Sequence, residues 1–310
     1  MTPTIPILVG PTASGKTALV LALARTMPRL EVVSADSRQV YRKLDIGTAK
    51  PTPAERAQVP HHLIDFLDPS ETYSAGRFRA DAERAIAECL VRGSLPIIVG
   101  GTGLYLRALA EGLSPIPHVS QEITRRLREE LAAEGLAALY RRLRETDPKA
   151  ASHIKPSDPQ RTIRALAVHE STGKPLSAWW ELPPASPEYA YAWLGVRWPR
   201  GLLRERIRQR TQTMLEAGLE REVRGLLAAG YPWETNALRT VGYREWRPFI
   251  EGERGTSLEE VREQIVIHTA QYAKRQMTWF AAEPQIHWLE GQSGDLADRA
   301  SHWIERVRTS

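Results

Sequence analysis

The sequence predicts an α/β protein: a P-loop core built on a doubly wound parallel sheet, with an inserted all-helical domain. Three observations support this class. Apolar strand-like runs alternate with helical patterns up to about residue 110, a phosphate-binding motif follows the first run, and proline-rich breaks enclose a wholly helical segment. We therefore divide the chain into a core at 1–113, a helical insertion at 114–190 and a return to the core at 191–310.

The core elements follow in order. TIPILVG is an apolar run ending in glycine, and KTALVLALART suits a buried helix. LEVVSADS gives a second strand, and the next helix places Phe78, Ala82, Ile86 and Leu90 on one face, with Gly93 as its cap. LPIIVGGTG is another apolar strand. Because these strands are continuously hydrophobic, we expect a parallel sheet covered on both faces.

The insertion reads as helices separated by prolines and glycines. Its third helix is predicted to begin at DPQRTIRALAV, with Asp158 as N-cap and Pro159 as first residue. A proline-rich linker then leads to AYAWLGV, a candidate returning strand. A long final helix is predicted from Ser257, where Glu260 would complete a capping box, to about Phe280.

Composition excludes several classes of protein. Cys89 is the single cysteine, so an internal disulfide, a cysteine zinc site and an iron–sulfur cluster are excluded, and we expect this residue to pack inside a helix. No apolar run reaches the length of a membrane span, and the first residues read as a strand rather than a secretion signal. We expect a cytoplasmic monomer without a membrane partner.

Positive charge is unevenly distributed. The net charge is +5, and residues 197–247 alone contain eleven arginines against six glutamates. Of 42 basic residues 35 are Arg, whose guanidinium suits phosphate recognition, although genomic codon bias explains that ratio equally well. All nine tryptophans lie beyond residue 178. We therefore expect the two halves of the chain to have different functional roles.

The stretch VGPTASGKTALV contains the strongest local motif. Gly10, Gly15, Lys16 and Thr17 fit G-x-x-x-x-G-K-[ST] between a strand and a helix. In such a loop backbone N–H groups and the helix N-terminus face the phosphates, the lysine neutralises their oxygens, and the threonine hydroxyl can ligate Mg²⁺. The motif predicts a diphosphate site without identifying what is attached to the diphosphate.

Other candidates lie at strand ends and on one helix. Asp36 follows the second strand and could hold Mg²⁺ through water, act as a general base, or cap the loop. Thr102, in GGTGLY, could donate its hydroxyl to a phosphate or a reacting group, or simply stand in a tight turn. Arg206 and Arg210 share a helical face, and either could clamp a phosphate or face solvent.

Six segments together support a family resemblance. GPTASGKT, SADSRQVY, GGTGLY, DPQRTIRALAV, RTVGYRE and YAKRQMTWF occur in the order and spacing of the bacterial tRNA dimethylallyltransferases. The similarity spans essentially the whole chain and is far more specific than the P-loop alone. It implies transfer of a dimethylallyl group from dimethylallyl diphosphate to N6 of the adenosine next to the anticodon (position 37) in tRNA, with release of diphosphate. The loop of that family holds this diphosphate and does not hydrolyse ATP.

The resemblance implies a role for each matching residue. Asp36 would accept the amine proton, Thr102 would position the reacting groups, and Thr17 would hold Mg²⁺ as the cofactor. The diphosphate would be bound by Gly10, Pro11, Thr12, Ala13, Ser14, Gly15, Lys16, Thr17 and Arg210. The insertion would grip the anticodon stem. The implied tRNA contacts are Asp36, Ser37, Arg38, Gln39, Thr102, Thr124, Gln160, Arg161, Thr162, Ile163, Arg164, Arg239, Thr240, Val241, Gly242, Tyr243 and Arg244.

The chain departs from the family pattern at one contact. Relatives often carry an arginine at or near Thr124, where the nearest arginines here are Arg125 and Arg126. The zinc finger of eukaryotic relatives cannot form with one cysteine. The alternatives are an adenylate isopentenyltransferase, which would not need the basic insertion, a small-molecule kinase using ATP, and a nucleotide-dependent RNA-binding switch.

Overall fold

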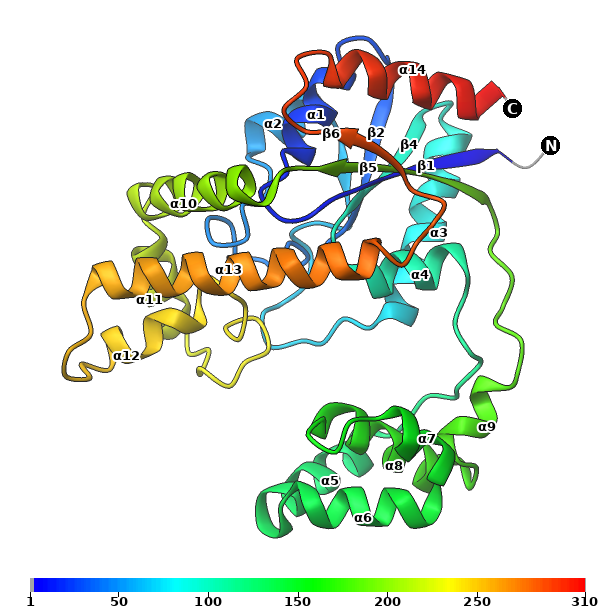
Figure 1. The fold of residues 1–310 in the computed structure, drawn as a ribbon, viewed down its shortest axis with the longest axis vertical. Coiled ribbons are helices and arrows are strands. Elements are labelled where there is room, and N and C mark those ends of the chain that lie inside the picture. The colour runs from blue at the N-terminus through cyan, green and yellow to red at the C-terminus, as the bar shows by residue number, and fades with distance from the viewer. Residues whose placement is uncertain (1–2, 310) are drawn as a thin grey trace. The chain divides into compact units, whose positions relative to one another are not determined.

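Six parallel strands form the centre of the computed structural model, which describes residues 3–309. In chain order they are β1 (Thr4–Val9), β2 (Leu30–Ala35), β3 (His61–His62), β4 (Leu95–Gly100), β5 (Ala190–Arg197) and β6 (His287–Glu290). Their order in the sheet is β3-β2-β4-β1-β5-β6 (Figure 1). The predicted parallel α/β sheet is confirmed.

Helices cover both faces of the sheet. Successive strand residues point to opposite faces, so neighbours on one strand pack against different helices. Leu8 of β1 packs with α1 (Lys16–Leu23) and α14 (Leu296–Thr309) in one layer. Its neighbours Ile7 and Val9 pack in the other layer, which contains α3 (Ala75–Val91) and α4 (Gly103–Ala110) (Figure 1). This double coverage explains why the strands are continuously hydrophobic.

The core also contains α2 (Pro53–Gln58). Its remaining helices form a second region beside the sheet: α10 (Arg200–Glu216), α11 (Leu219–Ala228), the short helices η1 (Arg244–Trp246) and α12 (Arg247–Ile250), and α13 (Leu258–Phe280). Helices α10 and α13 lie side by side (Figure 1), burying Ile207 against Val266 and Ala273. As predicted, Ser257 caps α13 by accepting a hydrogen bond from the Glu260 N–H, and the helix ends at Phe280. The capping box itself is incomplete, because the Glu260 side chain does not accept a bond from the Ser257 N–H.

The second compact unit is all-helical and comprises residues 111–187. Its helices are α5 (Gln121–Glu134), α6 (Leu136–Thr146), α7 (Pro148–His153), α8 (Pro159–Thr172) and α9 (Leu176–Trp180), which enclose a core of their own around Leu127, Leu143 and Leu166. Asp158 caps α8 as predicted. This unit begins and ends three residues before the expected bounds of 114 and 190, and just after its end Ala190 already pairs with Thr4 in the sheet.

Every helix within residues 3–309 is too short or too polar to cross a bilayer.

Candidate active site

The P-loop, Gly10–Thr17, joins the end of β1 to the start of α1. Gly15 precedes α1 with φ 90°, a left-handed conformation that favours glycine, and Ala13 takes a similar conformation with φ 64°. A Cβ at Gly10 would lie 2.7 Å from the Val196 carbonyl oxygen, so only glycine fits there. The loop thus presents the N-terminus of α1, which attracts anions, at the carboxyl edge of the sheet.

Lys16 is held against its own loop. Its Nζ donates to the carbonyl oxygens of Gly10 at 2.9 Å and Pro11 at 3.0 Å. Burial lowers the pKa of Lys16 to about 8; the nearby Asp36 charge opposes this shift, and the Arg210 charge adds to it. Burial also lowers the pKa of Arg210, again opposed by Asp36. The structure therefore brings three predicted residues, Lys16, Asp36 and Arg210, into one electrostatic cluster.

Asp36 follows β2 and caps the next turn. Its Oδ1 accepts hydrogen bonds from the backbone N–H groups of Arg38 at 2.8 Å and Gln39 at 3.2 Å. Both bonds use the same oxygen, so among the described residues Oδ2 is left for the cation cluster or a substrate. The loop-cap interpretation and the chemical one are thus compatible, because each uses a different carboxylate oxygen.

Thr102 follows β4 and connects the ends of two strands. Its Oγ1 accepts a hydrogen bond from the Ser37 N–H at 3.0 Å, and its own N–H donates to the Ala35 carbonyl. Burial and the Asp36 charge raise the pKa of the nearby Tyr272, on α13, to about 12. Thr102 therefore lies directly beside the segment that carries Asp36.

Three further side chains fix the P-loop: Gln276 and Trp198, which the sequence did not single out, and Arg206, which it named as a candidate phosphate clamp. Buried Gln276 of α13 accepts a hydrogen bond from the Thr12 N–H at 2.8 Å and donates to the Gly101 carbonyl at 2.9 Å. The Trp198 indole donates to the Ser14 carbonyl, and Arg206 donates to the Ala13 carbonyl at 2.8 Å. Arg206 and Arg210 thus act differently: the first braces the loop, and the second joins the Lys16 cluster.

The two tRNA-contact segments predicted in the core, 36–39 and 239–244, bond to different neighbours. Arg38 donates to the Asn236 carbonyl at 3.0 Å, and Gln39 donates to the carbonyls of Thr48 and Ala49. In the 239–244 segment Arg239 and Arg244 are exposed, whereas Tyr243 is fully buried and donates its hydroxyl to Glu222 at 2.6 Å. Tyr243 therefore anchors the 239–244 segment to the core and is not available for contact with RNA.

The other members of that segment have different exposures. Thr240 and Gly242 are buried and Val241 is partly exposed. Glu245 accepts a hydrogen bond from the Gly242 N–H at 2.8 Å and contacts Nδ1 of His268, on α13, at 2.7 Å. Helix α13 therefore holds both the P-loop, through Gln276, and the 239–244 segment, through His268.

In the helical unit the predicted contacts lie on α8 and α5. Gln160, Arg161 and Arg164 are exposed, whereas Thr162 and Ile163 are buried in the helical core. The Thr124 hydroxyl donates to the Ser120 carbonyl at 3.3 Å. The arginines beside it are both ion-paired within this unit: Arg125 with Glu129, and Arg126 with Glu170.

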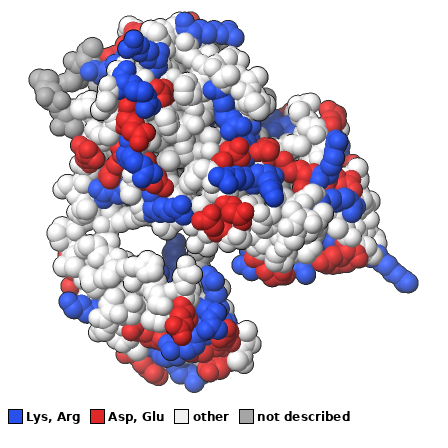
Figure 2. Space-filling view, turned by 180° about the vertical axis from the view of Figure 1, so that it is seen from behind, with Lys and Arg blue, Asp and Glu red and all other residues white. Residues whose placement is uncertain are grey.

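The predicted basic field is partly neutralised. Several arginines between 197 and 247 pair with glutamates; the pairs are Arg197–Glu290, Arg208–Glu205, Arg224–Glu220, Arg244–Glu245 and Arg247–Glu251. Figure 2 shows basic and acidic side chains interspersed on the face it presents. Three of these glutamates were already counted within 197–247, but Glu290 and Glu251 lie outside that range and reduce the excess of positive charge there.

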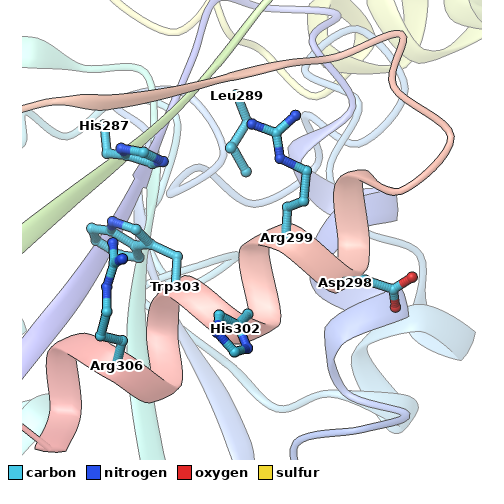
Figure 3. A pocket seen from close by; sticks show the side chains of 7 residues that line it. All are labelled: His287, Leu289, Asp298, Arg299, His302, Trp303 and Arg306. Atoms are coloured by element: carbon cyan, nitrogen blue, oxygen red, sulfur yellow. The ribbon is translucent and has the colours of Figure 1, made fainter.

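A pocket between β6 and α14 lies apart from this site. It is lined by His287, Leu289, Asp298, Arg299, His302, Trp303 and Arg306, with His287 stacked on Trp303 (Figure 3). None of these residues belongs to the predicted site. The candidate reacting groups gather instead at the carboxyl ends of β1, β2 and β4.

This fold defines an α/β protein whose P-loop motif lies at the carboxyl edge of a parallel sheet. The sequence model of the family described as IPP transferase matches residues 39–283, and the chain belongs to this family. The resemblance found in the sequence is therefore confirmed.

Individual relatives agree with this assignment. A protein of Geobacter metallireducens named tRNA dimethylallyltransferase is 48% identical, over 92% of this chain and 91% of the relative. One of the same name from Roseiflexus castenholzii is 47% identical over 98% of both chains.

Solved structures show the same relationship. The full-length tRNA isopentenylpyrophosphate transferase of Bacillus halodurans is 34% identical with a TM-score of 0.72, over 99% of this chain and 97% of the other. A eukaryotic dimethylallyltransferase studied acting on tRNA has a TM-score of 0.84 at 27% identity, over 98% of this chain and 79% of the other.

Proposed function

We propose that this protein transfers the dimethylallyl group of dimethylallyl diphosphate to N6 of the adenosine next to the anticodon (position 37) in tRNA, releasing diphosphate. One observation carries the proposal: Lys16 and Arg210 share a cluster with Asp36 beside the N-terminus of α1. This arrangement offers cations for a leaving diphosphate and a carboxylate for an attacking amine. The near full-length similarity to proteins named tRNA dimethylallyltransferase supports the same reaction.

The P-loop would bind the leaving group. Lys16 would exchange its two carbonyl contacts for diphosphate oxygens, and Arg210 would add a second cation. The Ser14 hydroxyl is buried and has no hydrogen-bond partner within the described residues, so a phosphate oxygen could satisfy it. Diphosphate leaves readily only when its developing charge is offset, and these groups together would do this.

Asp36 would act on the nucleophile. As the bond forms between N6 and the allylic carbon, the bond from that carbon to the diphosphate oxygen breaks, and Oδ2 of Asp36 takes the amine proton. The turn fixed through Oδ1 would keep this oxygen in place. Thr102, bonded to the Ser37 N–H, would position the reacting groups from the adjacent strand end.

The residues fit Mg²⁺ by their donor chemistry. Thr17, in the first turn of α1, offers a hydroxyl oxygen, and Mg²⁺ favours oxygen ligands shared between a few protein groups and substrate phosphates. We expect Thr17 to hold the ion together with the diphosphate. The bound ion would supply further charge neutralisation of the leaving group.

The helical unit would bind the anticodon stem. The exposed Gln160, Arg161 and Arg164 on α8 present donors of the kind that contact phosphates, as do Arg239 and Arg244 in the core. The adenosine must leave its stack to reach the carboxyl edge of the sheet, so a grip on the stem would stabilise the flipped base. We further propose that the protein acts as a cytoplasmic monomer.

A reconstituted reaction tests the proposal. Purified protein, Mg²⁺, dimethylallyl diphosphate and unmodified tRNA with adenosine at position 37 should give tRNA heavier by one dimethylallyl group without ATP, as measured by mass spectrometry of the nucleosides. Transfer to free AMP but not to tRNA would identify an adenylate isopentenyltransferase instead. Transfer of a phosphoryl group from labelled ATP would identify a kinase, and tRNA binding without any transfer would identify a switch.

A further inference from the structure

A cluster of three different metal-binding side chains lies away from the P-loop. Glu31 is the second residue of β2, His62 ends β3, and Cys89 lies near the end of α3. Glu31 is near the amino end of its strand, whereas the active site gathers at the carboxyl ends. Because Glu31 and Val33 point to the same face of the sheet, Glu31 faces the layer of α3, where Cys89 is fully buried.

The distances within this cluster resemble those around a tetrahedral metal ion. Bonds of roughly 2.3 Å to sulfur and 2.0–2.2 Å to nitrogen or oxygen place the ligand atoms about 3.3–3.6 Å apart. Here Sγ of Cys89 lies 3.4 Å from Oε2 of Glu31 and 3.5 Å from Nε2 of His62. The contact between Nε2 and Oε2 is a hydrogen bond of 2.6 Å and would have to open. Two of the three separations thus match already.

The contacts of the cluster show how a cation could enter it. Oε2 of Glu31 accepts hydrogen bonds from Arg92 and from the Cys89 thiol, and it contacts Nε2 of His62. A divalent cation would replace the thiol proton, which leaves to solvent.

Arg92 is the competing cation. Its Nη2 donates to Oε2 of Glu31 at 2.8 Å and lies 3.6 Å from Sγ of Cys89. The Arg92 side chain is 47% exposed, so it can swing into water when a metal takes its place. By contrast, the adjacent His61 bonds to the Val59 carbonyl through Nδ1 and is not part of the cluster.

We propose that Glu31, His62 and Cys89 form a binding site for a divalent cation of the zinc class, which ties β2, β3 and α3 together. The single cysteine excludes a zinc site made of cysteines, and this site instead combines one thiolate with an imidazole and a carboxylate. Mixed sulfur, nitrogen and oxygen ligands favour Zn²⁺ and Co²⁺ over Mg²⁺, which avoids thiolates. Three protein ligands leave a fourth position for water. The site is independent of the transfer reaction.

Cobalt is the sharpest probe, because the chain has a single cysteine. Metal-free full-length protein titrated with Co²⁺ at pH 7.5 should develop a thiolate-to-cobalt charge-transfer band that saturates at one equivalent and is removed by Zn²⁺. Excess Mg²⁺ should leave the band unchanged. Cys89→Ser should abolish it, His62→Gln and Glu31→Gln should weaken cobalt binding at least tenfold, and the matched control His61→Gln should keep it.

A second measurement does not depend on the spectrum. Zn²⁺ in excess should raise the Tm of the wild-type protein and of His61→Gln, but not that of Cys89→Ser, because a ligand that binds only the folded state stabilises it. Circular dichroism establishes that each variant is folded. A folded wild-type protein without a cobalt band at millimolar Co²⁺ would overturn the proposal. So would a band that His62→Gln and Glu31→Gln leave unaltered.

Discussion

In the core, the side chains expected to act on the substrate are bonded to main-chain groups, whereas those on α8 of the helical unit stand exposed. Lys16, Asp36 and Thr102 each bond to backbone atoms within or beside their loops. Gln160, Arg161 and Arg164 instead project from a helix whose buried face packs in its own core. Bond formation at one carbon demands fixed geometry, while attraction to a phosphate backbone requires only charge within reach. Substitutions in the core should therefore lower the rate of transfer strongly, whereas substitutions on α8 should weaken tRNA binding modestly.

The largest effect is expected at Asp36. Asp36→Ala should lower kcat by about 10²- to 10⁴-fold, the usual contribution of a general base, while the Kd for tRNA changes only a few-fold. Single-turnover kinetics and filter binding measure the two quantities. Asp36→Asn is the control, since its amide oxygen can still cap the turn. Equal losses of rate and affinity would make Asp36 a binding residue.

Gln276 should come next. Gln276→Ala leaves the Thr12 N–H and the Gly101 carbonyl unpaired, at roughly 1–3 kcal/mol for each buried group. We expect kcat/KM for dimethylallyl diphosphate to fall roughly 10- to 100-fold, with a lowered Tm. Gln276→Glu keeps the acceptor for Thr12 but turns an anionic oxygen toward the Gly101 carbonyl and the diphosphate, so its kcat/KM should fall at least as far as that of Gln276→Ala. An unchanged kcat/KM for Gln276→Ala would show that the loop holds its shape alone.

The pH dependence of substrate binding tests Lys16. Diphosphate needs the protonated lysine, whose pKa in the free protein is lowered to about 8, so affinity should be flat below that pH. Above it, binding must be accompanied by proton uptake, and the Kd for dimethylallyl diphosphate should rise up to about tenfold per pH unit. Isothermal titration calorimetry between pH 7 and 9.5 measures this. Lys16→Arg, which keeps its charge, should flatten the profile; a slope that persists in this variant would contradict the assignment.

The smallest effects are expected on α8. Arg161→Ala and Arg164→Ala should each weaken tRNA binding a few-fold and lower the dependence of log K on log salt by about one, with kcat unchanged at saturating tRNA. Lys149→Ala, on α7 and paired with Glu181, is the matched control. Loss of kcat at saturating tRNA would mean that α8 also positions the reacting base.

The sequence predicted those parts of the site that depend on local pattern and on one rule of parallel sheets. Asp36 and Thr102 each follow an apolar run, and the carboxyl ends of parallel strands meet at one edge, so their proximity was predictable. Gln276 was not, because its partner Thr12 lies 264 residues away and no local pattern encodes that contact. Likewise, the spacing of Arg206 and Arg210 shows a shared helical face but not which one reaches Lys16.

Helix α13 contacts two parts of the site through His268 and Gln276, and the spacing of these residues has a structural consequence. His268 and Gln276 are eight residues apart on one continuous helix, a rise of about 12 Å. The length of helix α13 between these two residues therefore sets the distance between the P-loop and the 239–244 segment. Inserting one residue between them would rotate the two attachment points against each other by about 100°, so the length of this stretch should resist change even where its exposed side chains do not.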